Sequence, residues 1–376
     1  MKVSELAAEL KKQNKDIIDK AALLGIDARG ATKILSEAEV DMIRHGFDNS
    51  AIIAAEEKKA RLMPRRIAKA DVEEAERARA EAEAAEEEKR LRYDNVPYGD
   101  AFARLMELCF GQDHPYGHTP IGRMADLEAA TLDDVRGFFH EHYQPANLTI
   151  ALAGALEPAT ALESVERHFG DISAPVPQAT RPVSSLGPLS GVPRHEVTAD
   201  VPQDAIYCAW RVPAVTDASS DALGLGLSIL TDGLAARFHQ ALVVPGLADS
   251  VDAFDLGLRH GNSLIGLVAT CDEAASTEQV EAMLMATWTE MTATGPTAAE
   301  LARAKVGEER DWLADLASPE TRAEALAEAI VTYGDADFVN HHLDQVNAVT
   351  VDQVQTAFAT HLAPANQAVL TYRRQK

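Results

Sequence analysis

Two histidines flank a glutamate in the stretch FFHEHYQPAN, which spans Phe138 to Asn147. Two imidazoles and a carboxylate are suitable zinc ligands, but they must converge on one ion. On a helix, His140 and His142 lie about 200° apart and point away from each other. The pattern therefore predicts a solvated helix end, where a late histidine suits the negative C-terminal dipole and Pro145 stops the helix.

A second pair of histidines, in HPYGH, has the i, i+4 spacing of a helical zinc site. Between His114 and His118, however, Gly117 stands where such a site needs a glutamate as its general base. Pro115 and Pro120 bracket the stretch, so we expect a loop rather than a continuous helix. From these residues we assign no catalytic residue and no metal site.

Composition narrows the class of protein. The 376 residues carry a formal net charge of -24, which argues against broad nucleic-acid binding. No apolar run reaches membrane-spanning length, and the opening twenty residues lack the pattern of a signal peptide, so we expect no membrane partner. Cys109, Cys208 and Cys271 form no CxxC pair and suggest no disulfide framework. A cytoplasmic location is the expectation that fits best.

An internal repeat links two distant segments, TLDDVRGFFHEHYQPAN (131–147) and TVDQVQTAFATHLAPAN (350–366). The offset is constant at 219, and each copy runs into an apolar, strand-like stretch, 148–154 and 367–372. His142 recurs as His361, which predicts an architectural role. The shared positions are Thr131, Asp133, Val135, Phe139, His142, Pro145, Ala146 and Asn147, which match Thr350, Asp352, Val354, Phe358, His361, Pro364, Ala365 and Asn366.

The first 92 residues have a different character. Residues 1–46 predict a small helical module, with Ser4 capping its first helix, Gly25 closing the second, and Ser36 opening the third in a capping box with Glu39. This module resembles the N-terminal domain of bacterial translation initiation factor two. Residues 47–92 are rich in Ala, Glu and Arg and predict a charged helical linker.

From 194 to 376 the pattern is that of a complete α+β unit. Strands are predicted at RHEVTAD, AIYCAWRV and QAVLTY, and a hairpin of ADSVDAFDLGL with NSLIGLVATC turns through Arg259, His260 and Gly261. Helices are predicted at SDALGLGLSILTDG and ARFHQALV, and four or five more between 277 and 362. The Gly, Pro and Ser residues of 172–193 predict a linker between this unit and a truncated first unit, 93–171.

Residues 88–376 resemble the insulinase/pitrilysin family of zinc peptidases, which includes the mitochondrial processing peptidases. The resemblance rests on EKRLRYDNVPYGDAF, on HPYGHTPIGRMADLEAATLDDVRGFFHEHYQPANLTIALAG and on LSILTDGLAARFHQALV, in that order. It implies duplicated α+β units, the first one here truncated. It also implies an H-x-x-E-H zinc motif, which this sequence lacks, and a third zinc ligand at Glu88.

Glu88 alone will not hold zinc, so no cofactor is expected and Glu88 is only a weak metal candidate. The family's carbonyl-binding Arg and Tyr would fall on Leu242 and Asp249, so that half-site is also missing.

Three functions follow from these patterns. The first is a catalytically inactive interaction or regulatory subunit, paired with a second insulinase-family chain or with itself, or bound to another peptide or protein. The second is a zinc endopeptidase with an atypical ligand set of Glu88, His114 and His118. The third is a translation-associated protein that acts through 1–46. A truncated first unit would leave apolar faces uncovered on stretch 148–154 and on helices near 98–110 and 157–169.

Overall fold

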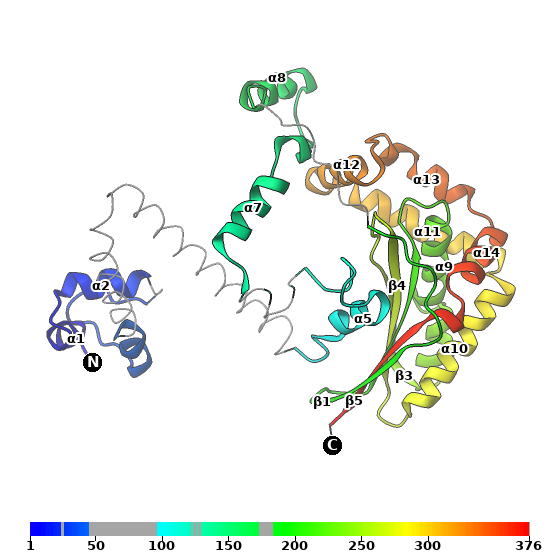
Figure 1. Cartoon of the computed structure of the whole chain (residues 1–376), viewed down its shortest axis with the longest axis horizontal. Coiled ribbons are helices and arrows are strands. Elements are labelled where there is room, and N and C mark those ends of the chain that lie inside the picture. The colour runs from blue at the N-terminus through cyan, green and yellow to red at the C-terminus, as the bar shows by residue number, and fades with distance from the viewer. Residues whose placement is uncertain are drawn as a thin grey trace. The chain divides into compact units, whose positions relative to one another are not determined.

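The computed structural model describes residues 1–23, 26–44, 96–120, 122, 126, 129–172 and 183–375. Contacts divide the chain into two compact units, Met1–Glu81 and Ala82–Lys376 (Figure 1). Glu88, Gly25 and the whole predicted linker 47–92 lie outside the described residues. The predicted domain boundaries therefore stay a prediction.

The N-terminal module has a core of its own. Helix α1 (Val3–Glu9) and helix α2 (Asn14–Leu23) are followed by a helix over 37–44, as the sequence predicted. An isolated bridge joins Lys2 to Ile34 and closes the module around its apolar side chains. The buried side chains are those of Val3, Leu6, Ala7, Ile17, Ala21, Ile26, Ala28, Leu35, Val40 and Ile43.

Of the two N-terminal helix caps predicted in this module, one is present. The Ser36 N–H donates to Glu39 Oε2 at 2.7 Å, and the Glu39 N–H donates to Ser36 Oγ at 3.3 Å, as a capping box requires. The prediction that Ser4 caps α1 is wrong. The helix begins at Val3, so Ser4 lies inside it and Lys2 is the N-cap residue, whose N–H donates to Glu5 Oε2 at 2.8 Å.

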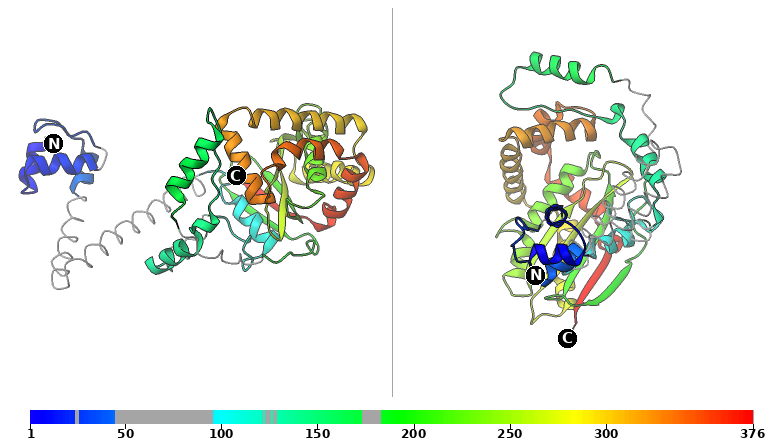
Figure 2. Two further views of the ribbon diagram at one scale, coloured as in Figure 1. Left: turned by 90° about the horizontal axis from the view of Figure 1, so that it is seen from above. Right: turned by 90° about the vertical axis from the view of Figure 1, so that its left-hand side faces the viewer.

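Within Ala82–Lys376, the predicted second peptidase-like unit, residues 194–376, is the part called the second unit from here on, and it is built on a five-stranded sheet in the order β1-β5-β2-β4-β3. β1 and β5 are parallel and lie side by side near the C-terminus (Figure 2), and the other pairs are antiparallel. The predicted hairpin is confirmed, because Phe254 pairs with Gly266 across its two strands. The strands are β1 (Arg194–Ala199), β2 (Ala205–Pro213), β3 (Ala248–Asp255), β4 (Asn262–Cys271) and β5 (Ala368–Arg374).

Helices cover one face of this sheet, seen on the right of the strands in Figure 1. Trp210 of β2 stacks on Trp288 with ring centroids 4.3 Å apart, and this pair forms the centre of the core. The helices on this side of the sheet are α9 (Ser220–Thr231), a short π-helix η3 (His239–Val243), α10 (Thr277–Thr294), α11 (Ala298–Asp315), α12 (Pro319–Tyr333), α13 (Phe338–Ala348) and α14 (Val351–His361).

Helix α5 (Ala101–Phe110) packs on the opposite face of the sheet. Leu105 is fully buried among residues that include Leu370 and Tyr372 of β5. The expectation that the helix near 98–110 has an uncovered face is therefore wrong, because the sheet of the second unit covers it. The side chains Tyr98, Asp100 and Arg104 strengthen the contact, and Tyr98 donates to the Gln203 carbonyl at 2.6 Å.

The described end of the predicted linker also packs on the sheet. Asn262 accepts a hydrogen bond from the Leu186 N–H at 2.6 Å and donates to the Leu186 carbonyl at 3.1 Å. Leu189 is buried in the same cluster as α5. Residues 185–189 therefore behave as part of the second unit rather than as a free linker, because a buried asparagine satisfies their backbone.

The two copies of the repeat have the same local structure. α7 (Leu132–His142) with the 3-10 turn η2 (Pro145–Asn147) matches α14 with η4 (Pro364–Asn366), at the offset of 219. Both helices begin with a capping box, Thr131 with Asp134 and Thr350 with Gln353. α8 (Pro158–Phe169) follows the first copy.

After this shared turn the copies diverge. The second copy continues into β5, but the predicted strand 148–154 is wrong, because these residues pair with no strand in the described part of the chain. β5 is a strand because β1 and β2 pair with its two edges. An extended segment without such neighbours has no ladder, whatever its sequence.

Candidate functional site

The HPYGH loop uses its histidines to hold the backbone. His114 stacks on Phe110 with ring centroids 5.1 Å apart, and its Nδ1 accepts the Tyr116 N–H at 3.1 Å. Its Nε2 therefore carries the proton and donates to the Ser184 carbonyl at 3.2 Å. Both ring nitrogens of His114 are thus engaged within the chain.

The predicted loop conformation of this stretch is confirmed. No helix forms over 111–120, and a Cβ on Gly117 would overlap the carbonyl of Gly111. His118 Nδ1 lies 3.2 Å from the Thr119 carbonyl oxygen. Within the described residues no group of three or more His, Cys, Asp or Glu side chains is placed to hold a metal ion. The absence of zinc remains a prediction, since Glu88 is not described.

His140 and His142 stand at the exposed end of α7. Their carbonyls carry the structural contacts, because Gln144 Nε2 donates to the His140 carbonyl and Asn147 Nδ2 donates to the His142 carbonyl at 3.0 Å. The side chain of the counterpart, His361, is more enclosed, and burial lowers its pKa. Because these contacts are made by the backbone, the architectural role predicted for the His142 side chain stays a prediction.

The positions of the family's carbonyl-binding pair are occupied by residues of other kinds. Leu242 is fully buried in the core of the second unit, and Asp249 accepts a hydrogen bond from Gln203. Neither side chain presents a positive charge or a phenol to a substrate carbonyl. The structure thus gives these positions a packing role and a surface hydrogen bond.

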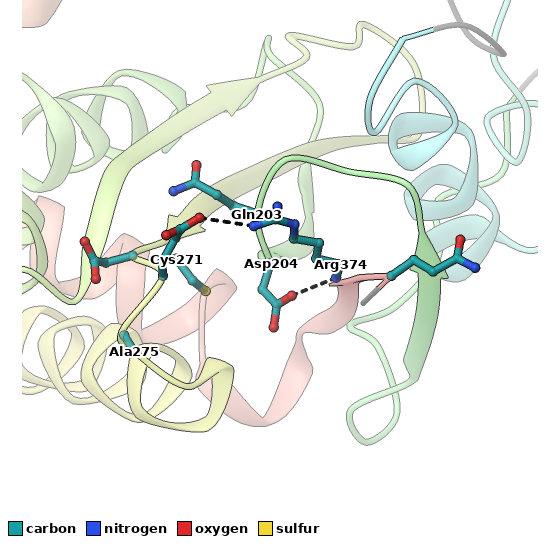
Figure 3. Close-up of a pocket in the computed structure, with 8 residues that line it drawn as sticks. Gln203, Asp204, Cys271, Ala275 and Arg374 are labelled. Atoms are coloured by element: carbon teal, nitrogen blue, oxygen red, sulfur yellow. Dashed lines mark hydrogen bonds and ion pairs between the residues drawn. The ribbon is translucent and has the colours of Figure 1, made fainter.

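A cavity of about 530 Å³ lies beside Gln203, Asp204, Cys271 and Arg374 (Figure 3). The Arg374 N–H donates to Asp204 Oδ1 at 2.7 Å, and its guanidinium pairs with Glu273 at 3.1 Å. Burial raises the pKa of the Cys271 thiol to about 12, so this sulfur is not a nucleophile at neutral pH. The cavity therefore offers no thiolate nucleophile.

The apolar side of the first repeat copy is exposed where the second copy is buried. Val354, Phe358, Leu362 and Val369 are 0%, 0%, 0% and 1% exposed, whereas their counterparts Val135, Phe139, Tyr143 and Ile150 are 46%, 59%, 66% and 41% exposed. A hollow of about 630 Å³ opens there, lined by residues of α7's end, η2, segment 148–150 and α8's end. We call this surface the repeat face and define it by Val135, Phe139, Tyr143, Leu148, Ile150 and Leu152.

Sequence reasoning located only half of the repeat face. It predicted that this chain leaves the apolar side of stretch 148–154 uncovered, and Leu148, Ile150 and Leu152 are all exposed. It did not assign a surface to Phe139 or Tyr143. The signal was present in the repeat, because the second copy buries Phe358 and Leu362 at the same positions.

Two parts of the chain are similar to known protein families. Residues 129–307 match the family model described as the peptidase M16 inactive domain, and residues 1–50 match the translation initiation factor IF-2 N-terminal region. The zinc protease PqqE of Helicobacter pylori is 26% identical over 267 residues, which are 69% of this chain and 59% of that protein. This chain thus spans less than two thirds of that relative's length.

Two solved structures share the fold. A protease from Helicobacter pylori aligns with a TM-score of 0.71 at 22% identity, over 79% of this chain and 72% of that one. A peptidase M16 inactive domain from Pseudomonas fluorescens aligns with a TM-score of 0.69 at 21% identity, over 80% and 71%. Residues 129–307 are therefore similar to the peptidase M16 inactive domain, and residues 1–50 to the N-terminal region of IF-2, in agreement with the resemblance that the sequence predicted.

Proposed function

We propose that this chain is a catalytically inactive, peptidase-like subunit that acts by binding another polypeptide, in the first place a second chain of the insulinase type. The observation that carries the proposal is the exposure of the repeat face, whose counterpart in the same chain forms part of a core. Exposed apolar side chains gathered at a hollow, as Tyr143, Leu148 and Ile150 are, are typical of interaction sites.

The chemistry of the described residues supports the inactive half of this proposal. The zinc motif is missing from the sequence, and the histidines of HPYGH are engaged with backbone groups. Burial also keeps the thiols of Cys109 and Cys271 protonated, raising each pKa to about 12. We propose no bound zinc and no catalytic residue.

Metal content and cleavage assays on the purified full chain test this. We expect less than a stoichiometric amount of zinc and no cleavage of unfolded casein above background. The Glu88→Ala variant is the matched control, since Glu88 is the one ligand that the family resemblance supplies. Chelator-sensitive cleavage that Glu88→Ala abolishes would refute the inactive assignment in favour of the atypical zinc peptidase.

A second candidate function rests on the N-terminal module. Residues 1–50 match the IF-2 region, and the described part of this module encloses its own apolar core. We propose that it binds a component of the translation machinery. Co-sedimentation of the full chain with ribosomes, compared with a chain that lacks 1–46, decides it: equal sedimentation of the two would exclude this role.

The compartment is proposed from the thiols. All three cysteines are free and buried, which suits a reducing cytoplasm. No helix in the described part of the chain has the length and apolarity that crossing a membrane needs.

A further inference from the structure

The second copy of the repeat shows which contacts the repeat face can make. There, the carbonyls of Leu362 and Ala363 accept hydrogen bonds from the indole N–H groups of Trp288 at 2.7 Å and Trp210 at 3.0 Å. At the offset of 219 the matching carbonyls belong to Tyr143 and Gln144, two residues that line the 630 Å³ hollow. Two N–H donors from another polypeptide, placed as those indoles are, could therefore reach the carbonyls of Tyr143 and Gln144 in this hollow.

Helix α9 shows what lies against the aromatic ring of the repeat. Gly226 approaches the ring of Phe358 so closely that a Cβ there would overlap it. The counterpart ring, Phe139, is exposed and stacks on Tyr143 with centroids 4.2 Å apart. A partner helix that packs on Phe139 as α9 packs on Phe358 needs a glycine, or a residue nearly as small, at that contact.

The segment of the first copy that corresponds to β5 also lacks the neighbours that β5 has. β5 pairs with β1 on one edge and with β2 on the other. Residues 148–153 of the first copy follow the same turn but have no ladder partner among the described residues. An extended segment of another chain can therefore pair with this backbone by strand addition.

Helix α10 also covers the second copy of the repeat, with a buried face formed by Val280, Leu284 and Trp288. Among the described residues no side chain covers Phe139 in this way, since that ring is 59% exposed.

Charge disfavours a second copy of the chain as the partner. Residues 129–172 carry seven Asp and Glu residues and only two Arg, and the whole chain has a formal net charge of -24. Two such faces would repel each other, whereas a partner with a basic rim would be attracted. In a second copy, moreover, α9 and α10 already pack on α14.

We infer that the repeat face binds a different polypeptide that presents a strand and two helices arranged as β2, α9 and α10 are, with a small residue opposite Phe139 and a basic rim. This rests on the proposed role as an interaction subunit and specifies its surface. The partner completes the first repeat copy in trans, as the second unit completes its own copy in cis.

Photo-crosslinking in cells of the source organism tests the inference on the full chain. A benzophenone amino acid replaces Phe139, Ile150 or, as a control far along the chain, the exposed Val306 of α11. We expect positions 139 and 150 to capture the same polypeptide, attached to a helix from 139 and to a strand from 150. The purified pair should bind at least 10-fold more weakly with Phe139→Asp, while Phe139→Leu should retain binding, and affinity should fall as salt rises.

Each other outcome has a defined meaning. Capture of a second copy of this chain, or attachment of both probes to a region without a strand and helices, overturns the inference. Capture from position 306 alone overturns it while leaving an interaction role intact. No capture from any of the three positions refutes the surface and the proposed interaction role together.

Discussion

Replacing Phe358 or Phe139 by alanine compares one residue in two environments of the same chain. Phe358 is fully buried, touches Gly226 and lies 5.5 Å from the Trp288 ring. Its truncation removes the transfer free energy of a phenyl ring and leaves a cavity, so Phe358→Ala is expected to cost about 3–5 kcal/mol. In a unit of this size that lowers the melting temperature by roughly 6–20 °C.

Phe139 is expected to behave differently because it is 59% exposed. Its main neighbour is Tyr143, four residues along the same helix, and such pairs contribute about 0.2–0.5 kcal/mol. Phe139→Ala should therefore change the free energy of unfolding by no more than about 0.5 kcal/mol in the isolated chain. The ratio of the two changes in the free energy of unfolding thus measures how far the first copy of the repeat is uncovered.

Urea unfolding followed by tryptophan fluorescence and by far-ultraviolet circular dichroism is the assay. Trp210, Trp288 and Trp312 all lie in the second unit, so fluorescence reports on that unit, while dichroism also includes α7. Equal destabilisation by the two variants in both signals would show that Phe139 is packed in the isolated chain. The reasoning from the repeat face would then be wrong.

Three further perturbations follow from particular contacts. Gly226→Ala should destabilise the second unit by about 1–3 kcal/mol because the new methyl overlaps the Phe358 ring, whereas Gly224→Ala in the same helix, with open space around it, should be neutral or stabilising in the same melts. Arg237 donates to Glu300 from two nitrogens at 2.8 Å, and this pairing holds the pKa of the Glu300 carboxyl at about 2, below the usual 4.5. The ion pair should therefore contribute about 2 kcal/mol to the free energy of unfolding above pH 4.5. This contribution should be lost as the pH falls toward 2. Glu300→Gln should remove that dependence, and an unchanged pH profile would contradict the assignment. His140→Gln/His142→Gln should melt within about 1 °C of the unaltered chain, with or without equimolar zinc, because both side chains are exposed; a large zinc-dependent loss would mean that this pair binds metal.

The sequence predicted local structure better than it predicted contacts between distant segments. The capping box of Ser36 with Glu39, Pro145 at the end of α7, and the β3-β4 hairpin all follow from short-range chemistry. The strand at 148–154 failed because strand formation needs a neighbour from elsewhere in the chain. The burial of α5 was missed for the same reason: its partner, β5, lies more than 250 residues further along.

The energetics of the repeat face explain why a lone helix would be an insufficient partner. Its six apolar side chains are each roughly half exposed, so completing their burial contributes about 1 kcal/mol apiece at the usual coefficient. That gross gain of roughly 6 kcal/mol lies at the lower end of the cost of association, about 4–15 kcal/mol. A ladder along 148–153 and two donors to the carbonyls of 143 and 144 would add about 1 kcal/mol per hydrogen bond. Only a partner that supplies the strand together with the helices passes that threshold, which is the combination that β2, α9 and α10 provide in the second copy.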